Sequence, residues 1–220
     1  MKIISIVRHG GFLVFPILAL LLVFSCSDPQ SPPVKKELDR SAGNLLLAFA
    51  KSYKEMELAG YDDCLDEDFR FIFTPQVADS LSLPPDEAWW GKTEEIACAG
   101  NMFEDPVVLK VTFSYETLGD WIPTQEVRED TVFAGLFRRL DPLIEVTVSA
   151  GSEYDPMLKF LVDESWLDVI VVPDRFTEGL WCILSIQEVE KNPLGAPLVS
   201  AGVATGRSTW GIIKATWAGE

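Results

Sequence analysis

Two groups of side chains in the sequence are of types that carry out acid–base or metal chemistry. The first is Tyr53, whose hydroxyl could face a cavity; its alternative role is a core aromatic residue with the hydroxyl at the edge of the core. The second is a cluster of five acids, and carboxylate oxygens are ligands that Ca²⁺ prefers. The cluster comprises Asp62, Asp63, Asp66, Glu67 and Asp68. It lacks the glycine and spacing of an EF-hand loop, so we expect these acids to face water and predict no metal and no cofactor.

Histidine chemistry is absent from the expected mature protein. The single histidine, His9, lies in an N-terminal segment that we expect to be removed. Without it the chain cannot form a Ser-His-Asp or Cys-His centre, or a metal site that contains histidine.

The net charge of −16 repels phosphate backbones, so we expect no nucleic-acid partner.

Three cysteines remain after the N-terminal segment, and they lie far apart in sequence. They are Cys64, Cys98 and Cys182. The neighbours of Cys98 and Cys182 are apolar, and no pair has CxxC spacing. We therefore predict three buried thiols, with one disulfide and one remaining thiol as the alternative.

The N-terminus has the pattern of an export signal. Lys2 and Arg8 precede an apolar run over residues 11–24, which is shorter than the roughly 18 residues of a membrane-spanning helix. Val23, Ser25 and Cys26 resemble the bacterial lipobox. This resemblance implies a signal peptide over residues 1–25 and a lipoprotein acylated at Cys26, for example with palmitate. An ordinary cleaved signal and an uncleaved anchor are the alternatives.

Attachment to a membrane follows from that resemblance, because several acyl chains on one cysteine hold a protein far better than one. Ser27 follows the cysteine where an aspartate would favour the inner membrane, so the pattern resembles that of outer-membrane lipoproteins facing the periplasm. Residues 26–41 are polar and contain proline, which is typical of a flexible tether.

The apolar periodicity predicts helices first and strands later. Residues 44–57 have the spacing of a helix with one buried stripe, Gly60 ends it, residues 61–65 form a short helix, and residues 69–73 form a strand. Thr93 is the expected N-cap of a third helix, whose buried face comprises Ile96, Ala99, Gly100 and Phe103.

Alternation of apolar residues predicts strands at residues 107–116 and 144–148. A nearly continuous apolar and β-branched run predicts a strand covered on both faces at residues 166–172, and a last strand follows at residues 180–189. Residues 119–130 read as irregular. The pattern does not decide between helix and strand at residues 131–140, nor at residues 208–217. The two tryptophans of this last segment favour a cap on the core.

The order of helix, short helix and strand over residues 44–75 resembles the nuclear transport factor 2-like (NTF2-like) superfamily, which includes SnoaL-like proteins and ketosteroid isomerases. The helix in DEAWWGKTEEIACAGNMF, introduced by aromatic residues, and the strand that begins at Trp181 resemble it too. The resemblance implies an α+β fold at residues 42–190: a strongly curved antiparallel sheet wrapped around three N-terminal helices, forming a cystatin-like cone. Residues 191–220 would be a C-terminal loop and capping segment.

A cone of this type implies an internal pocket, and seven aromatic residues are its candidates. They are Phe49, Tyr53, Phe69, Phe71, Phe73, Trp89 and Trp90. Trp89 and Trp90 could line the mouth of the pocket or pack in the core, and as neighbours they cannot both point the same way.

Comparison with ketosteroid isomerases disfavours that chemistry. Their tyrosine donates a hydrogen bond to an oxyanion and their aspartate moves a proton. Phe49 and Thr74 take these places here, and neither has the required group. We therefore assign no catalytic residue and expect a lipid-anchored envelope domain that holds a small apolar ligand or a protein partner without catalysis. The alternatives are a SnoaL-like enzyme (isomerase, cyclase or dehydratase type) that uses a carboxylate and a tyrosine, and a structural envelope protein with a filled core.

Overall fold

The computed structural model describes residues 42–149, 158–191 and 205–218. All of them belong to one compact unit, Asp39–Glu220. The predicted signal peptide, the lipidation site at Cys26 and the tether lie outside the described residues. Within the described ranges, no helix has the length and apolar character needed to cross a membrane.

The helices occur in two groups along the chain. α2 (Ala42–Glu55), α3 (Leu58–Asp62), α4 (Pro75–Ser80) and α5 (Lys92–Glu104) come early, with a 3-10 turn at Pro85–Glu87, and α6 (Trp210–Trp217) comes last. α2 buries Leu45, Leu46, Phe49 and Tyr53, as the helical spacing predicted. The sequence pattern did not decide between helix and strand at residues 208–217, and the structure places the helix α6 there.

The strands form one sheet. They are β1 (Leu65–Ile72), β2 (Trp89–Gly91), β3 (Val108–Arg128), β4 (Thr131–Val148), β5 (Leu158–Val162), β6 (Ser165–Pro173), β7 (Trp181–Glu190) and β8 (Thr205–Ser208). Their order is β2-β1-β7-β6-β4-β5-β8, and β3 pairs with the other edge of β4. Most pairs are antiparallel, but β1 with β7 and β5 with β8 are parallel, so the sheet is mixed rather than wholly antiparallel.

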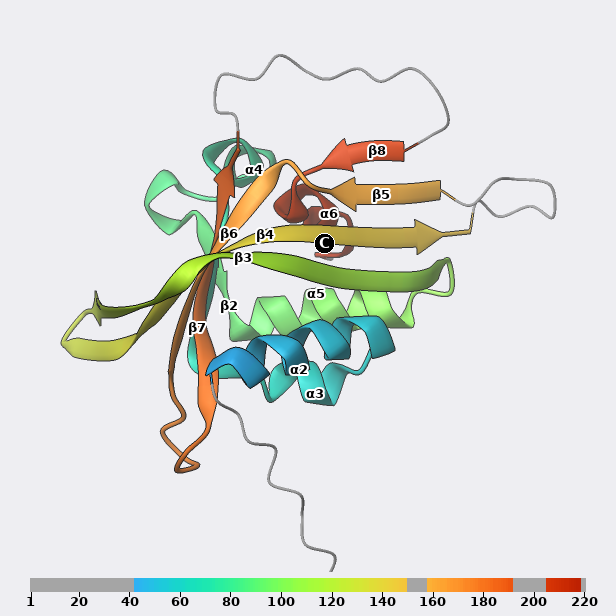
Figure 1. Ribbon diagram of the computed structural model, residues 1–220. Helices are drawn as coiled ribbons and strands as arrows, with labels where there is room; N and C mark the ends of the chain where they lie inside the picture. Colours follow the sequence, from blue (N-terminus) through green and yellow to red (C-terminus); the bar gives the residue numbers. More distant parts are fainter. Residues whose placement is uncertain (1–41, 150–157, 192–204, 219–220) are drawn as a thin grey trace, which may run out of the picture. The chain divides into compact units, whose positions relative to one another are not determined.

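The curvature of the sheet follows from how β4 is shared. β6 pairs with the first half of β4, at Leu136–Leu140, and β5 pairs with the second half, at Ile144–Val148. The sheet therefore bends around β4, and α2, α3 and α5 lie together on one side of it (Figure 1). This is the α+β cone that the sequence predicted.

The hairpin of β3 and β4 is longer than the sequence indicated. Residues 119–130, predicted to be irregular, continue β3 to Arg128, and within them the pairing with β4 is interrupted by a register shift between Leu118 and Ile122. Residues 131–140 are strand, which resolves the ambiguity there. The prediction for residues 119–130 was wrong because this part of the hairpin is largely exposed. Neither of its faces has to be apolar, so its residues do not alternate between polar and apolar as those of a half-buried strand do.

The far end of this hairpin is attached to the rest of the sheet by Arg128. Its guanidinium donates to the backbone oxygens of Asp68 in β1 and Leu184 in β7, and to the Glu126 carboxylate at 2.7 Å. Phe133 packs with Val172 and Leu184 in a small second core. Because the neighbours Val171 and Ile183 belong to the main core, alternation along the strands places this second core on the face away from the helices.

Candidate functional site

A buried carboxylate lies at the centre of the main core. Glu95, in the first turn of α5, is only 1% exposed. Its Oε2 accepts a hydrogen bond from Trp90 Nε1 at 2.7 Å, and its Oε1 accepts from the Tyr61 hydroxyl and from the Lys214 ammonium. The Tyr61 hydroxyl also forms a 2.8 Å hydrogen bond with the Tyr53 hydroxyl. Acid, base and hydroxyl groups are therefore gathered inside the cone.

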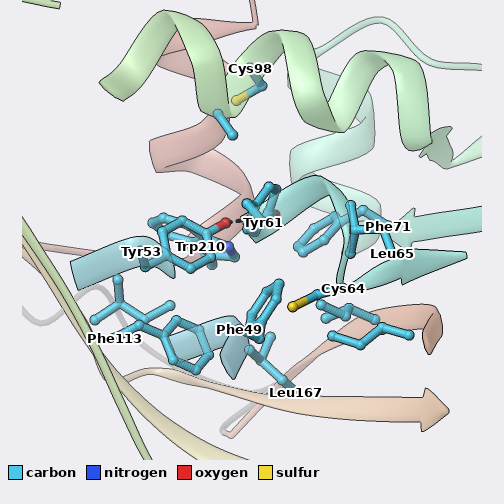
Figure 2. Close-up of a cluster of buried hydrophobic side chains, with 14 of the residues drawn as sticks. Phe49, Tyr53, Tyr61, Cys64, Leu65, Phe71, Cys98, Phe113, Leu167 and Trp210 are labelled. Carbon is cyan, nitrogen blue, oxygen red and sulfur yellow. Dashed lines mark hydrogen bonds between the residues drawn. The ribbon is translucent and has the colours of Figure 1, made fainter. Parts of the chain in front are cut away.

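Each of these side chains comes from a different element. Tyr53 lies on α2, Tyr61 on α3, Trp90 on β2, Glu95 on α5 and Lys214 on α6. The two tyrosine rings pack edge to face, with their centroids 4.9 Å apart. Figure 2 shows them together with Phe49, Phe113 and Trp210 around them. The packing of three helices against the sheet therefore places the hydroxyls beside the carboxylate.

The electrostatics of this centre keep its hydroxyls protonated. Burial raises the pKa of Tyr53 and of Tyr61 well above the ordinary tyrosine value, and the Glu95 carboxylate raises both further. Cys98, one turn after Glu95 on α5, has its pKa raised to about 12, chiefly by burial and then by Glu95. The groups around Glu95 therefore act as hydrogen-bond donors at neutral pH, and the Lys214 ammonium supplies the opposite charge.

A second buried acid, Glu188 of β7, holds the start of α6. Its carboxylate accepts hydrogen bonds from the amides of Trp210 at 2.6 Å and Gly211 at 3.2 Å, and from the Ser165 hydroxyl at 2.9 Å. Burial raises the pKa of Glu188. An anionic group at this position also suits the positive end of the helix dipole.

The other end of α6 is held by side chains of α5 and of the residue after it. Asn101 donates to the backbone oxygen of Trp217 at 3.0 Å, and Cys98 donates to that of Lys214 at 3.4 Å. The Trp217 indole donates to Asp105 at 2.9 Å. α6 is therefore attached at both ends, and its Trp210 and Lys214 side chains fill space inside the cone.

The predicted pocket residues are brought together, with one exception. Phe49, Tyr53, Phe69, Phe71, Phe73 and Trp90 are all buried in the main core. Trp89 instead lies on the outside, where the Arg70 guanidinium stacks on its ring at 4.1 Å. The two neighbouring tryptophans thus point in opposite directions. Whether these residues bind a ligand stays a prediction, because the core aromatics pack against one another.

An open cleft of about 670 Å³ lies on the outer surface beside β1 and β2. Its walls are the start of α5, the strands β1 and β2, and the far end of the β3–β4 hairpin. Aromatic and charged side chains line it, among them Asp62, Glu67, Asp68, Phe69, Arg70, Trp89, Lys92, Glu94, Arg128, Glu129 and Phe133. We call this the outer cleft.

The acidic cluster forms ion pairs with basic side chains. Lys92 lies 3.0 Å from Asp62 and 2.9 Å from Glu67, and the Arg175 guanidinium bridges the carboxylates of Asp66 and Asp68. Asp66 is buried rather than exposed to water. In the part of the chain that the structure describes, no group of His, Cys, Asp and Glu has an arrangement that could hold a metal ion.

The prediction of buried cysteines is confirmed, since Cys64, Cys98 and Cys182 all lie in the interior.

The sequence missed the four residues that form the polar interior. They are Tyr61, Glu95, Glu188 and Lys214. α5 begins at Lys92 with Gly91 as its N-cap, two residues before the predicted Thr93, and its buried residues are Glu95, Cys98, Ala99 and Met102. Ala99 alone is common to the predicted face. A usable signal was Lys214, the single charge in the apolar segment WGIIKATW.

No family model matches the chain, and no curated protein matches it. Solved structures of similar fold include a protein of unknown function from Mycobacterium tuberculosis (15% identity, 80% of this chain and 85% of that chain, TM-score 0.45). A putative dehydratase of the NTF2-like family from Streptomyces avermitilis is 12% identical over 68% of this chain and 93% of that one, with a TM-score of 0.41. An NTF2-like superfamily protein from Salmonella enterica is 10% identical over 75% and 96%, also with a TM-score of 0.41. These likenesses concern the fold.

Proposed function

We propose that this protein is a lipid-anchored domain of the bacterial cell envelope that binds a protein partner without catalysis. The observation that carries the proposal is the closed interior. Both oxygens of Glu95 accept hydrogen bonds from the protein's own side chains, and one of these donors is the Lys214 ammonium of α6. A general base must reach the proton that it removes, and Glu95 in this arrangement does not face open space.

The outer cleft supports a protein partner more than a small apolar ligand. Its walls combine aromatic rings with arginine, the residue types that are enriched where proteins bind one another. Arg70 stacks on Trp89, and among the described residues it has no acidic partner, so its five N–H donors are available to a bound chain. A ligand without polar groups would leave these donors unsatisfied.

The partner site can be tested by photocrosslinking in living cells. A photoreactive residue at Thr93, which lines the outer cleft, should give a discrete crosslinked product that is lost on Arg70→Ala. The matched control places the same residue at Leu47, which is 62% exposed on α2 and does not line the cleft. No product from position 93, or the same product from both positions, would contradict the proposal.

The lipid anchor is tested separately by labelling cells with a palmitate analogue. The label should appear in the wild-type protein and be lost on Cys26→Ala, whereas Cys98→Ala, which changes a buried thiol, should keep it. A labelled Cys26→Ala protein, or an unlabelled wild-type protein that fractionates as soluble, would rule out the anchor.

A SnoaL-like enzyme is the second candidate, and the contact between Tyr61 and Glu95 favours it because tyrosine and carboxylate are the groups that it requires. Such an enzyme needs α6 to leave the interior during turnover. Hydrogen–deuterium exchange separates the two functions. Protection of the α6 amides equal to that of β7 supports the non-catalytic domain, and much faster exchange in α6 supports the enzyme.

A further inference from the structure

The Lys214 ammonium occupies an unusual environment for a lysine. Lys214 is 2% exposed, and its Nζ lies 3.9 Å from the centre of the Phe71 ring, 5.4 Å from that of Trp210 and 5.9 Å from that of Trp90. The Glu95 carboxylate completes the enclosure. Aromatic faces around a carboxylate are the arrangement by which proteins recognise organic ammonium groups.

Most of this enclosure is built without α6. Glu95 is oriented by Trp90 on one oxygen and by Tyr61 on the other, and Tyr61 is itself held by Tyr53. Of the groups around the ammonium, Trp210 alone belongs to the same helix as Lys214. Two of the hydrogen bonds that orient the carboxylate therefore do not depend on the ammonium.

We propose that the interior of the cone is a binding site for a primary alkylammonium group, and that the chain's own Lys214 is the ligand that occupies it in this structure. An anion that remains buried without its partner is unfavourable, because the charge is desolvated. A vacated site therefore favours the entry of another cation that fits the space. This inference concerns Glu95, which does not line the outer cleft, so it is independent of the proposed partner binding.

Lys214→Ala creates the vacancy. The substitution keeps the β-carbon and removes three carbons and the ammonium nitrogen, and these are the heavy atoms of n-propylammonium. In the full chain, n-propylammonium chloride should raise the Tm of Lys214→Ala in a saturable manner. At a concentration about tenfold above its Kd, it should raise the folding equilibrium constant about elevenfold.

Three controls define the site. Propan-1-ol has the same shape without the charge, and sodium chloride at equal ionic strength reproduces the salt effect; neither should raise the Tm to the same extent. Lys214→Met keeps the length of the side chain without the ammonium, so it should not respond to n-propylammonium. The double variant Glu95→Gln/Lys214→Ala should lose the response, because the carboxylate is gone.

The proposal is overturned if Lys214→Ala responds equally to n-propylammonium and to sodium chloride. An equal response of the wild-type protein to n-propylammonium also overturns it, because the effect then does not arise at the vacated position. If Lys214→Ala does not fold in buffer, refolding is measured by near-ultraviolet circular dichroism. Native signal recovered in n-propylammonium but not in propan-1-ol supports the site, and no recovery in either counts against it.

Discussion

The backbone amide of Gly211 lies 3.2 Å from a carboxylate oxygen of Glu188, and the contact is so close that position 211 has no room for a side chain. A β-carbon built there would lie 2.9 Å from the Glu188 carboxylate, from the Phe73 ring and from a methyl group of Val77. The position of α6 in the interior therefore depends on a glycine at its second residue.

Gly211→Ala should reduce the free energy of unfolding by about 1–3 kcal/mol, because the added methyl group overpacks a filled core. Gly43→Ala is the matched control, since Gly43 is exposed on α2 and has nothing within 4 Å of an added β-carbon. It should be neutral or stabilise by about 0.5 kcal/mol. Urea denaturation measures both. Equal effects of the two substitutions would show that α6 does not pack as described.

Tyr61→Phe should reduce the free energy of unfolding by about 1–3 kcal/mol, because the Glu95 carboxylate and the Tyr53 hydroxyl each lose a partner in the interior. Tyr115→Phe removes the same hydroxyl from a half-buried residue of β3 that has no such partner among the described residues, so it should change little. The two variants are compared by thermal and urea unfolding. A neutral Tyr61→Phe would mean that the hydroxyl does not hold Glu95.

The free energy of unfolding should depend on pH through Glu188. Its pKa is raised from 4.5 by burial, so the folded protein binds this proton more tightly than the unfolded chain does. The associated stabilisation is fully present below pH 4.5 and is lost as the pH rises through the raised pKa. The wild-type protein should therefore lose stability relative to Glu188→Gln between pH 4.5 and neutrality. A difference that stays constant or changes in the opposite direction would contradict this.

Cys98 should be unreactive in the folded protein. Its thiol is buried and its pKa is about 12, so the reactive thiolate is scarce at neutral pH and reagents cannot reach it. Maleimide labelling followed by peptide mass spectrometry should show slow modification of Cys98 in buffer and rapid modification in urea. Fast labelling without denaturant would indicate that α5 and α6 separate readily.

The sequence predicted correctly those helices and strands whose buried face can be recognised from their own apolar residues. The stripe of α2 and the three phenylalanines of the β1 segment were read correctly, because one face of each element is apolar, and the apolar, β-branched run of residues 166–172 correctly predicted the strand β6. The extension of β3 was missed because its residues are mostly exposed, and the parallel pairing of β1 with β7 has no signature in either strand.

The polar interior could not be predicted for a related reason. A glutamate in the first turn of a helix normally faces solvent and interacts favourably with the helix dipole, so the position of Glu95 in the sequence does not indicate burial. Its burial depends on donors from α3, β2 and α6, and no local pattern shows that Tyr61, Trp90 and Lys214 converge on one carboxylate. The predicted buried face differs for the same reason, since it was chosen by apolar residue type and Ile96, Gly100 and Phe103 are only half-buried.

The parallel pairing of β1 with β7 also determines at which stage of synthesis the native fold can form. Phe71 of β1 lies opposite Ile186, a residue made long after it, and the interior is closed only by α6 near the end of the chain. Pairings between such distant residues form slowly, because a long loop must be ordered before they are made. A growing polypeptide is therefore expected to acquire its native structure only when synthesis has passed Trp217, and any earlier stop should yield a product that proteases degrade.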